Sequence, residues 1–291
     1  MDRQRLLVGV DGGGTHCRAR VATADGLVFG EARGGSANIF SDPGGAALVV
    51  RRTVEDALAA AGLDATALAR CHAGLGLAGA NVPDAARAFA AEPLPFASYR
   101  LASDAVIACL GAHGGADGGI AIFGTGTAYV ARRQGSHTVF GGWGLAVSDR
   151  GSGADIGRAA LAAALDAHDG LGERSALTDE VMGGFDNDPA HLAIFAGKAR
   201  PGDFGRFAPL VWDRLDAGDA VAEAIVARAL AAVEPALRRL LALGVPAISL
   251  LGGMAGRYAP LLPGDIISCL ASPLGDGLDG ALVLAAETLP Q

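Results

Sequence analysis

One local pattern occurs twice in this chain, and this repeat limits the folds that the chain can adopt. Residues 6–31 read as an apolar strand, a Gly-rich turn with a threonine, an alternating strand, a turn and a third strand. Residues 120–140 repeat this order. An internal repeat of one supersecondary unit indicates a duplicated structure. We therefore predict an α/β fold built from two βββ-α units with mixed sheets, although chance similarity is the alternative in a chain with 44 glycines.

The boundary between the two units is predicted at the Gly-rich run 114–119. The domains would then be residues 1–115 and 116–291. A closing helix, 279–288, is expected to pack back toward the N-terminal domain. A long helix over 219–243 contains Pro235, where we expect a kink or a break. Further helices are predicted by apolar periodicity over 45–61, 104–111, 153–167, 177–182 and 189–196.

Composition excludes several classes of protein. The formal net charge is −8, and an acidic chain without a basic run is a poor binder of nucleic acid. Lys198 is the single lysine and lacks the spacing that a P-loop requires. The four cysteines form no C-x-x-C pair, which argues against a zinc site or a redox dithiol.

Nothing in the sequence predicts a membrane segment or a secretory signal. No apolar stretch approaches the ~18 residues that span a bilayer. Residues 1–5 lead directly into a strand and lack the pattern of a signal peptide. We expect a cytoplasmic protein with no membrane partner.

The sharpest motif is Asp11-Gly12-Gly13-Gly14-Thr15. Glycines let several backbone N–H groups approach one phosphate, and the threonine hydroxyl adds a donor. Asp11, at the end of a strand, is a candidate to hold Mg²⁺ through water. A dinucleotide fingerprint would need a helix after the glycines, whereas a strand follows here. The remaining alternative is a tight hairpin capped by an aspartate.

The second turn, Gly124-Thr125-Gly126-Thr127, stands at the matching place in the repeat. Alone it is a weak signal. Paired with the first turn, it predicts two hairpins that clamp a polyphosphate from opposite sides.

Asp104 follows a predicted strand and opens a helix, the kind of junction where ligands meet open α/β sheets. A helix N-cap is the competing explanation for an acidic residue there. If Ser103 caps the helix, Asp104 is free to act on a substrate.

A polar, Gly-rich loop precedes the helix that begins near residue 153. Trp143 lies between glycines that cannot bury it, so it is a candidate to stack on a ligand. Asp149 is a candidate acceptor for ligand hydroxyl groups. The alternative is a helix-entry loop in which Asp149 or a nearby serine caps the helix.

Taken in order along residues 6–288, these motifs resemble one family. The chain is similar to bacterial N-acetylglucosamine and glucosamine kinases, grouped with the BadF/BadG/BcrA/BcrD ATPases in the actin-like sugar-kinase superfamily. The segments that carry the resemblance also include 35–39, 76–80, 111–113, 251–253 and 279–282.

The resemblance implies two ribonuclease-H-like (actin-like ATPase) domains with ATP and Mg²⁺ in a cleft between them. It implies phosphoryl transfer from ATP to the 6-hydroxyl of an amino sugar, with Asp104 as the base and Asp11 near the metal. The ATP-binding positions would be Gly12, Gly13, Gly14, Thr15, Gly124, Thr125, Gly126, Thr127, Gly252 and Gly253. The sugar-binding positions would be Asn38, Asp104, Thr125, Trp143, Gly144 and Asp149.

One departure from the family bears on the substrate. Many relatives carry Glu or Gln where this chain has Arg150, which leaves free and N-acetylated amino sugars both open. The partners expected are the amino sugar and ATP, with a homodimer as a further possibility. Two other functions remain as alternatives: an ATPase that activates a radical dehydratase through a cluster held by cysteines, and a non-catalytic ATP- or sugar-binding sensor.

Overall fold

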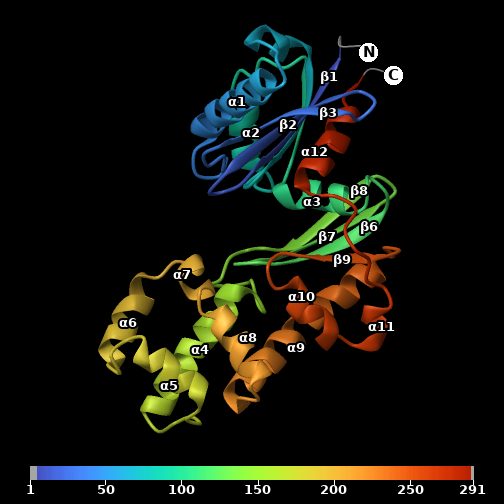
Figure 1. Ribbon diagram of the computed structural model, residues 1–291. Coiled ribbons are helices and arrows are strands. Elements are labelled where there is room, and N and C mark those ends of the chain that lie inside the picture. Colours follow the sequence, from blue (N-terminus) through green and yellow to red (C-terminus); the bar gives the residue numbers. More distant parts are fainter. Residues whose placement is uncertain (1–4, 290–291) are drawn as a thin grey trace. The chain divides into compact units, whose positions relative to one another are not determined.

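The structure is a computed structural model that describes residues 5–289, and it divides into two compact units (Figure 1). Unit 1 contains the chain up to Gly118, the short segment Gln134–His137 and the chain from Ser272 onward. Unit 2 contains Gly119–Arg133 and Thr138–Ala271. The first unit is therefore built from both ends of the chain.

The sheet of unit 1 has the strand order β3-β2-β1-β4-β5. The first three strands are antiparallel neighbours, as the sequence pattern predicted, whereas β1, β4 and β5 run parallel. The sheet is therefore mixed. Its strands are β1 (Leu6–Gly12), β2 (Cys17–Thr23), β3 (Val28–Gly34), β4 (Cys71–Leu77) and β5 (Ser98–Ala102).

Helices cover both faces of this sheet. The alternation Cys17-x-Ala19-x-Val21 points one side of β2 toward α1 (Pro43–Ala60), where these residues are fully buried. The 3-10 helix η1 (Ala65–Arg70) and helix α2 (Pro83–Ala90) contact α1. The opposite face is covered by α3 (Asp104–Ala112) and α12 (Gly277–Ala286), which contact β1 and β4.

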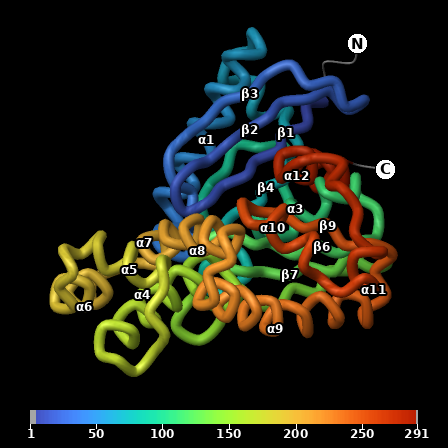
Figure 2. The backbone as a smooth tube through the Cα atoms, turned by 60° about the horizontal axis from the view of Figure 1, so that its bottom comes forward, coloured from blue at the N-terminus to red at the C-terminus, as the bar shows by residue number. Residues whose placement is uncertain are grey.

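Helix α12 lies unusually close to its neighbours because glycines line the contact (Figures 1 and 2). A β-carbon on Gly74 of β4 would lie 2.0 Å from the Ala281 carbonyl oxygen. On Gly111 of α3 it would lie 1.8 Å from the Asp276 carbonyl oxygen. The absence of side chains thus lets the last helix of the chain pack directly on backbone, beside strands made from its first residues.

The sheet of unit 2 has the order β8-β7-β6-β9. It begins with the repeated pattern: β6 (Gly118–Phe123), β7 (Thr127–Arg133) and β8 (Ser136–Gly141). Strand β9 (Ile248–Leu251) pairs in parallel with β6, as β4 does with β1. A single parallel bridge from Ile248 to Leu270 takes the place that β5 holds in the first sheet.

Most of unit 2 is helical. The long helix α9 continues through Pro235, so the predicted break is absent; Val233 and Leu237 are fully buried on either side and hold it in place. Two helices that the sequence pattern did not predict, α7 and α8, follow α6. The helices of this unit are α4 (Gly153–His168), α5 (Ala176–Gly183), α6 (Pro189–Lys198), α7 (Pro201–Gly205), α8 (Ala208–Asp216), α9 (Ala220–Ala242), α10 (Ala255–Tyr258), the 3-10 helix η2 (Ala259–Leu261) and α11 (Gly264–Ile267).

A membrane-spanning helix is absent from the described part of the chain. Across residues 5–289, none of the helices combines the length and the apolar character needed to cross a bilayer.

Candidate functional site

The first glycine-rich turn of unit 1 joins β1 to β2. Gly12 is closely packed, since a β-carbon there would lie 2.6 Å from Leu77. The Gly13 N–H donates to the His16 carbonyl oxygen at 2.8 Å and closes the turn. Gly14 and Thr15 are exposed at its tip. The turn therefore combines an anchored base with a tip that is open to a ligand.

Asn38 lies beside this turn. The Ala37 N–H donates to the Gly13 carbonyl oxygen at 3.0 Å, which fixes the segment after β3 against the turn. A β-carbon on Gly14 would come within 3.9 Å of the Asn38 amide nitrogen. The structure thus brings one predicted sugar-binding residue next to the predicted phosphate-binding turn.

A cavity of about 490 Å³ adjoins the turn. Asp11 accepts a hydrogen bond from Arg18 at 2.6 Å, and the same guanidinium donates to Asp276 at 2.9 Å. Asp11 is therefore ion-paired and only partly exposed. The residues lining the cavity are Asp11, Gly13, Gly14, Thr15, His16, Arg18 and Arg33.

Asp104 lies at the end of β5, where α3 begins. Ser103 caps the helix, because its hydroxyl accepts the Val106 N–H at 3.3 Å. The carboxylate of Asp104 accepts the adjacent Ala105 N–H at 2.9 Å and stays exposed to solvent. Desolvation by the surrounding protein raises the pKa of Asp104, and the nearby charge of Asp11 raises it further. The serine therefore does the capping, and the aspartate is available to a substrate.

The second turn, Gly124–Thr127, is fixed by the two segments that follow β8 and β9. The Gly153 N–H at the start of α4 donates to the Gly124 carbonyl oxygen at 2.9 Å. Gly252 has φ +91° and sits so close to β6 that a β-carbon would lie 2.5 Å from the Phe123 carbonyl oxygen. Only glycine fits there. The structure thus places the predicted residues Gly252 and Gly253 beside the second turn.

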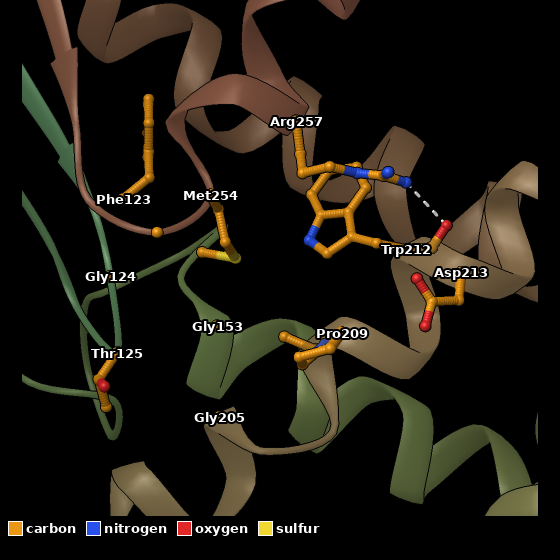
Figure 3. Close-up of a pocket in the computed structure, with 12 residues that line it drawn as sticks. Phe123, Gly124, Thr125, Gly153, Gly205, Pro209, Trp212, Asp213, Met254 and Arg257 are labelled. Carbon is orange, nitrogen blue, oxygen red and sulfur yellow. Dashed lines mark hydrogen bonds between the residues drawn. The ribbon is translucent and has the colours of Figure 1, made fainter.

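A second cavity of about 490 Å³ opens beside this turn, entirely within unit 2 (Figure 3). Trp212 from α8 forms one wall, and the Arg257 guanidinium lies 5.2 Å from its ring centroid. Arg257 also donates to the Trp212 carbonyl oxygen at 2.8 Å. The lining residues are Phe123, Gly124, Thr125, Gly153, Gly205, Ala208, Pro209, Trp212, Asp213, Gly253, Met254 and Arg257.

Asp149 has the features of a residue held in place for a ligand. Its backbone is in the left-handed region, with φ +54°, which is strained for a residue other than glycine. The side chain is buried against Gly126, and its Oδ1 atom has no hydrogen-bond partner among residues 5–289. Burial raises the pKa of Asp149, while backbone N–H groups of Thr127 and Gly144 oppose that shift.

The loop that carries Asp149 is tied to the core by Tyr258. This tyrosine is fully buried, and its hydroxyl donates to the Gly151 carbonyl oxygen at 2.5 Å. Its ring contacts Phe123, at the base of the second turn, and Trp212, in the cavity wall. Asp155 accepts the Gly151 N–H at 3.0 Å and fixes the same loop from α4.

The remaining predicted residues differ in exposure. Trp143 is 65% exposed, as expected between glycines with positive φ. Thr125 is exposed and lines the cavity, whereas Thr127 is buried, with its hydroxyl bonded to Tyr129. Gly144 accepts the Ser148 N–H at 2.8 Å and closes the loop between Trp143 and Asp149.

Sequence reasoning predicted Gly124, Thr125 and Gly253 of the second cavity but missed Trp212 and Arg257 in its wall. Trp212 and Arg257 are far apart in the chain, and only the packing of α8 beside α10 joins them. A proline one residue after the start of α8, Pro209, is a recognisable helix-start signal that marks this segment. Arg33 was missed as well, because its place beside the first turn depends on strand register.

Residues 8–262 match the sequence profile of the BadF/BadG/BcrA/BcrD ATPase family. The chain belongs to the BadF/BadG/BcrA/BcrD ATPase family. This match covers both glycine-rich turns, Asp104 and the Asp149 loop. Membership in an ATPase family supports the use of ATP.

Within and around this family, the chain is similar to proteins named as sugar kinases. It is 37% identical over 284 residues to the glucosamine kinase GspK of Vibrio cholerae, covering 96% of this chain and 95% of that one. It is 30% identical over 185 residues to the N-acetylmuramic acid/N-acetylglucosamine kinase of Clostridium acetobutylicum, covering 61% and 59% of the two chains.

Among solved structures, the chain superimposes on a protein from Chromobacterium violaceum whose suggested activity is that of an N-acetylglucosamine kinase. The TM-score is 0.85 at 35% identity, over 97% of this chain and 99% of the other. This likeness confirms the fold class predicted for the chain, an actin-like sugar-kinase fold with two mixed sheets.

Proposed function

We propose that this chain is an ATP-dependent amino-sugar kinase that phosphorylates the 6-hydroxyl of glucosamine or N-acetylglucosamine. Full-length similarity to a glucosamine kinase supports this activity. The observation in the structure that carries it is Asp104, a carboxylate left free by the Ser103 cap in the same unit as the Gly13–Thr15 turn. A sugar hydroxyl that accepts a phosphoryl group needs a carboxylate of this kind beside the turn that binds the phosphates.

Asp104 is proposed as the general base. A primary hydroxyl is a weak nucleophile, and a carboxylate within hydrogen-bond reach orients it and accepts its proton as the bond to phosphorus forms. The raised pKa of Asp104 makes its carboxylate a better proton acceptor than an ordinary aspartate.

The phosphates are proposed to bind mainly through backbone N–H groups. In unit 1 these would come from Gly12, Gly13 and Gly14, with the Thr15 hydroxyl as a further donor. In unit 2 they would come from Gly124–Thr127 and Gly252–Gly253. Of these, Gly124, Thr125 and Gly253 line the second cavity, where the flat ring of Trp212 suits a nucleobase. The Trp212 Nε1–H is buried and lacks a partner among residues 5–289, so it can donate to a bound nucleotide.

Mg²⁺ fits this site as a partner of the phosphates. Residues 5–289 contain no cluster of three or more His, Cys, Asp or Glu side chains that could hold a metal. Mg²⁺ commonly binds one or two carboxylates together with water and substrate phosphates. Asp11, with one oxygen paired to Arg18, is the carboxylate that we propose to reach the ion through water. The ion would neutralise charge on the transferred phosphoryl group.

The sugar is proposed to contact Asn38, Thr125, Trp143, Gly144 and Asp149, besides Asp104. Asp149 has an unpartnered, buried oxygen, which a sugar hydroxyl can satisfy. Trp143 offers an exposed aromatic face for the apolar side of a pyranose ring.

The two alternatives are less well supported. For the dehydratase activator, Cys17, Cys71 and Cys109 are buried within unit 1, and the near full-length relative is named a kinase. A non-catalytic sensor of ATP or sugar would have no role for the free carboxylate of Asp104.

We further propose a cytoplasmic location and an absence of nucleic-acid and membrane partners, on the basis of the net charge of −8 and the sequence pattern. A homodimer is the assembly to test, and light scattering coupled to size-exclusion chromatography measures it directly.

The deciding experiment is a coupled assay of ADP release with glucosamine, N-acetylglucosamine, N-acetylmannosamine, N-acetylmuramic acid and glucose. We expect the highest kcat/KM with glucosamine or N-acetylglucosamine, and a product phosphorylated at the 6-hydroxyl by mass spectrometry and NMR. ATP binding without turnover of any sugar would favour the sensor.

A further inference from the structure

Arg33, on β3, is a cation that lies opposite another cation in the sheet. In the antiparallel register of β2 and β3, Arg33 stands directly opposite Arg18. Two positions along, on the same face, Arg20 stands opposite Glu31 and bonds to it at 2.7 Å. Like charges opposite one another destabilise a sheet, and opposite charges stabilise it. The same two strands therefore hold one complementary pair and one repulsive pair.

The neighbouring carboxylates pair with Arg18 and not with Arg33. Arg18 is committed to Asp11 and Asp276, which occupy its two terminal nitrogens. Arg33 is exposed and makes no ion pair or side-chain hydrogen bond within the described chain, 5–289. The cavity beside the first turn thus contains a guanidinium that no acidic group neutralises.

The surroundings of Arg33 indicate which ligand it takes. It lines the cavity together with Gly13, Gly14 and Thr15, the turn whose backbone N–H groups suit phosphate oxygens. A guanidinium fork matches a phosphoryl group with two parallel hydrogen bonds. A carboxylate ligand would also meet a cation, but it would use fewer of the donors gathered here.

We propose that Arg33 binds a phosphoryl group in this cavity, most directly the terminal phosphate of ATP. The inference rests on the proposed kinase function and adds to it a residue that recognises substrate through its charge. A phosphate would lie between Arg33 and the turn and would supply the counter-charge that Arg33 lacks within the described chain.

The test compares Arg33→Met and Arg33→Lys with Arg52→Met. Arg52 is an exposed arginine on α1 of the same unit, so its replacement makes the same change in charge away from the cavity. For Arg33→Met we expect KM for ATP to rise about tenfold and KM for sugar to change less than twofold. Arg33→Lys should recover part of the loss, and Arg52→Met should resemble the wild type.

Two binding measurements separate the phosphate sources and exclude a purely structural role. Calorimetry with ATP, ADP, tripolyphosphate and glucosamine 6-phosphate should show the largest loss for ATP and tripolyphosphate. A loss confined to glucosamine 6-phosphate would assign Arg33 to the product phosphate and overturn the ATP assignment. Without ligand, the Tm of Arg33→Met should be close to that of the wild type, because Arg33 makes no ion pair or side-chain hydrogen bond within the described chain, and ATP should raise it less.

The inference fails if the wild type has kinase activity and Arg33→Met shows the same KM for ATP and the same affinity for tripolyphosphate. It also fails if the Tm of Arg33→Met without ligand falls while its shift with ATP is unchanged. Absence of sugar-dependent turnover in the wild type would instead refute the proposed function. Tripolyphosphate binding would still test Arg33 in that case.

Discussion

Replacing Gly280 with alanine should force α12 away from α3. A β-carbon on Gly280 would lie 1.8 Å from the Ile107 carbonyl oxygen and 2.5 Å from the Gly111 nitrogen. Ordinary contact begins at 3.4 Å, so the helices would have to separate by about 1.6 Å, the difference between 3.4 and 1.8 Å. The obstacle is backbone, which cannot rotate aside as a side chain can.

The magnitude follows from two opposing effects. Alanine favours a helix interior over glycine by up to about 1 kcal/mol. Overpacking a close contact costs about 1–3 kcal/mol, and the upper end applies where backbone meets backbone. The separation would also loosen Leu278, Ala281 and Leu284, all buried on α12. We therefore expect Gly280→Ala to lower the free energy of unfolding by about 2 kcal/mol.

Urea unfolding followed by circular dichroism measures this change. The matched control is Gly197→Ala on α6, where a β-carbon would meet nothing within 4 Å. That control keeps the helix-propensity gain without the clash, so its stability should equal or slightly exceed that of the wild type. If Gly280→Ala were as stable as Gly197→Ala, the close backbone contact would not be a determinant of the fold of unit 1.

Three further substitutions test the site. Asp104→Asn should bind ATP and sugar but lose 10²- to 10⁴-fold in kcat, measured by ADP release. In the wild type, the raised pKa of Asp104 should place the acid limb of the kcat profile above pH 3.8, because only the carboxylate accepts a proton; a limb at or below that value would contradict the assignment. Trp143→Ala should raise KM for sugar far more than KM for ATP, and equal effects would remove Trp143 from the sugar site. Tyr258→Phe keeps the ring but leaves the Gly151 carbonyl without its hydroxyl partner, so sugar KM should rise several-fold and stability should fall by about 1–2 kcal/mol; unchanged sugar kinetics would show that the loop is held without this bond.

The parts of the fold that the sequence predicted are those with strong local signals. The three strands of each repeat alternate or run apolar between clear turns, and the structure confirms them. Helices α2 and α8 were missed although each has a proline at or next to its first position, a helix-start signal that the sequence reasoning did not use. Of the two outcomes expected at Pro235, a kink or a break, the break was wrong because burial along α9 outweighs one missing hydrogen bond.

In the candidate site, too, local sequence signals identified some residues and missed others. The sequence identified Asp104 but not which of two neighbours caps the helix, since either residue type can do so; the Ser103 hydrogen bond decides it. Trp212 and Tyr258 could not be found, because their contact depends on the packing of α8 against α10. Arg33 needed the register of β3, which no local pattern specifies.

The placement of α12 also orders events during synthesis. The strands of unit 1 and α3 precede unit 2 in the chain, whereas α12, which covers β1 and β4 together with α3, follows it. Unit 2 can therefore complete its core while α3 alone covers that face of the first sheet. The nascent chain therefore exposes an apolar, glycine-lined surface until residues 277–286 emerge, and chaperones would have to protect it during that interval.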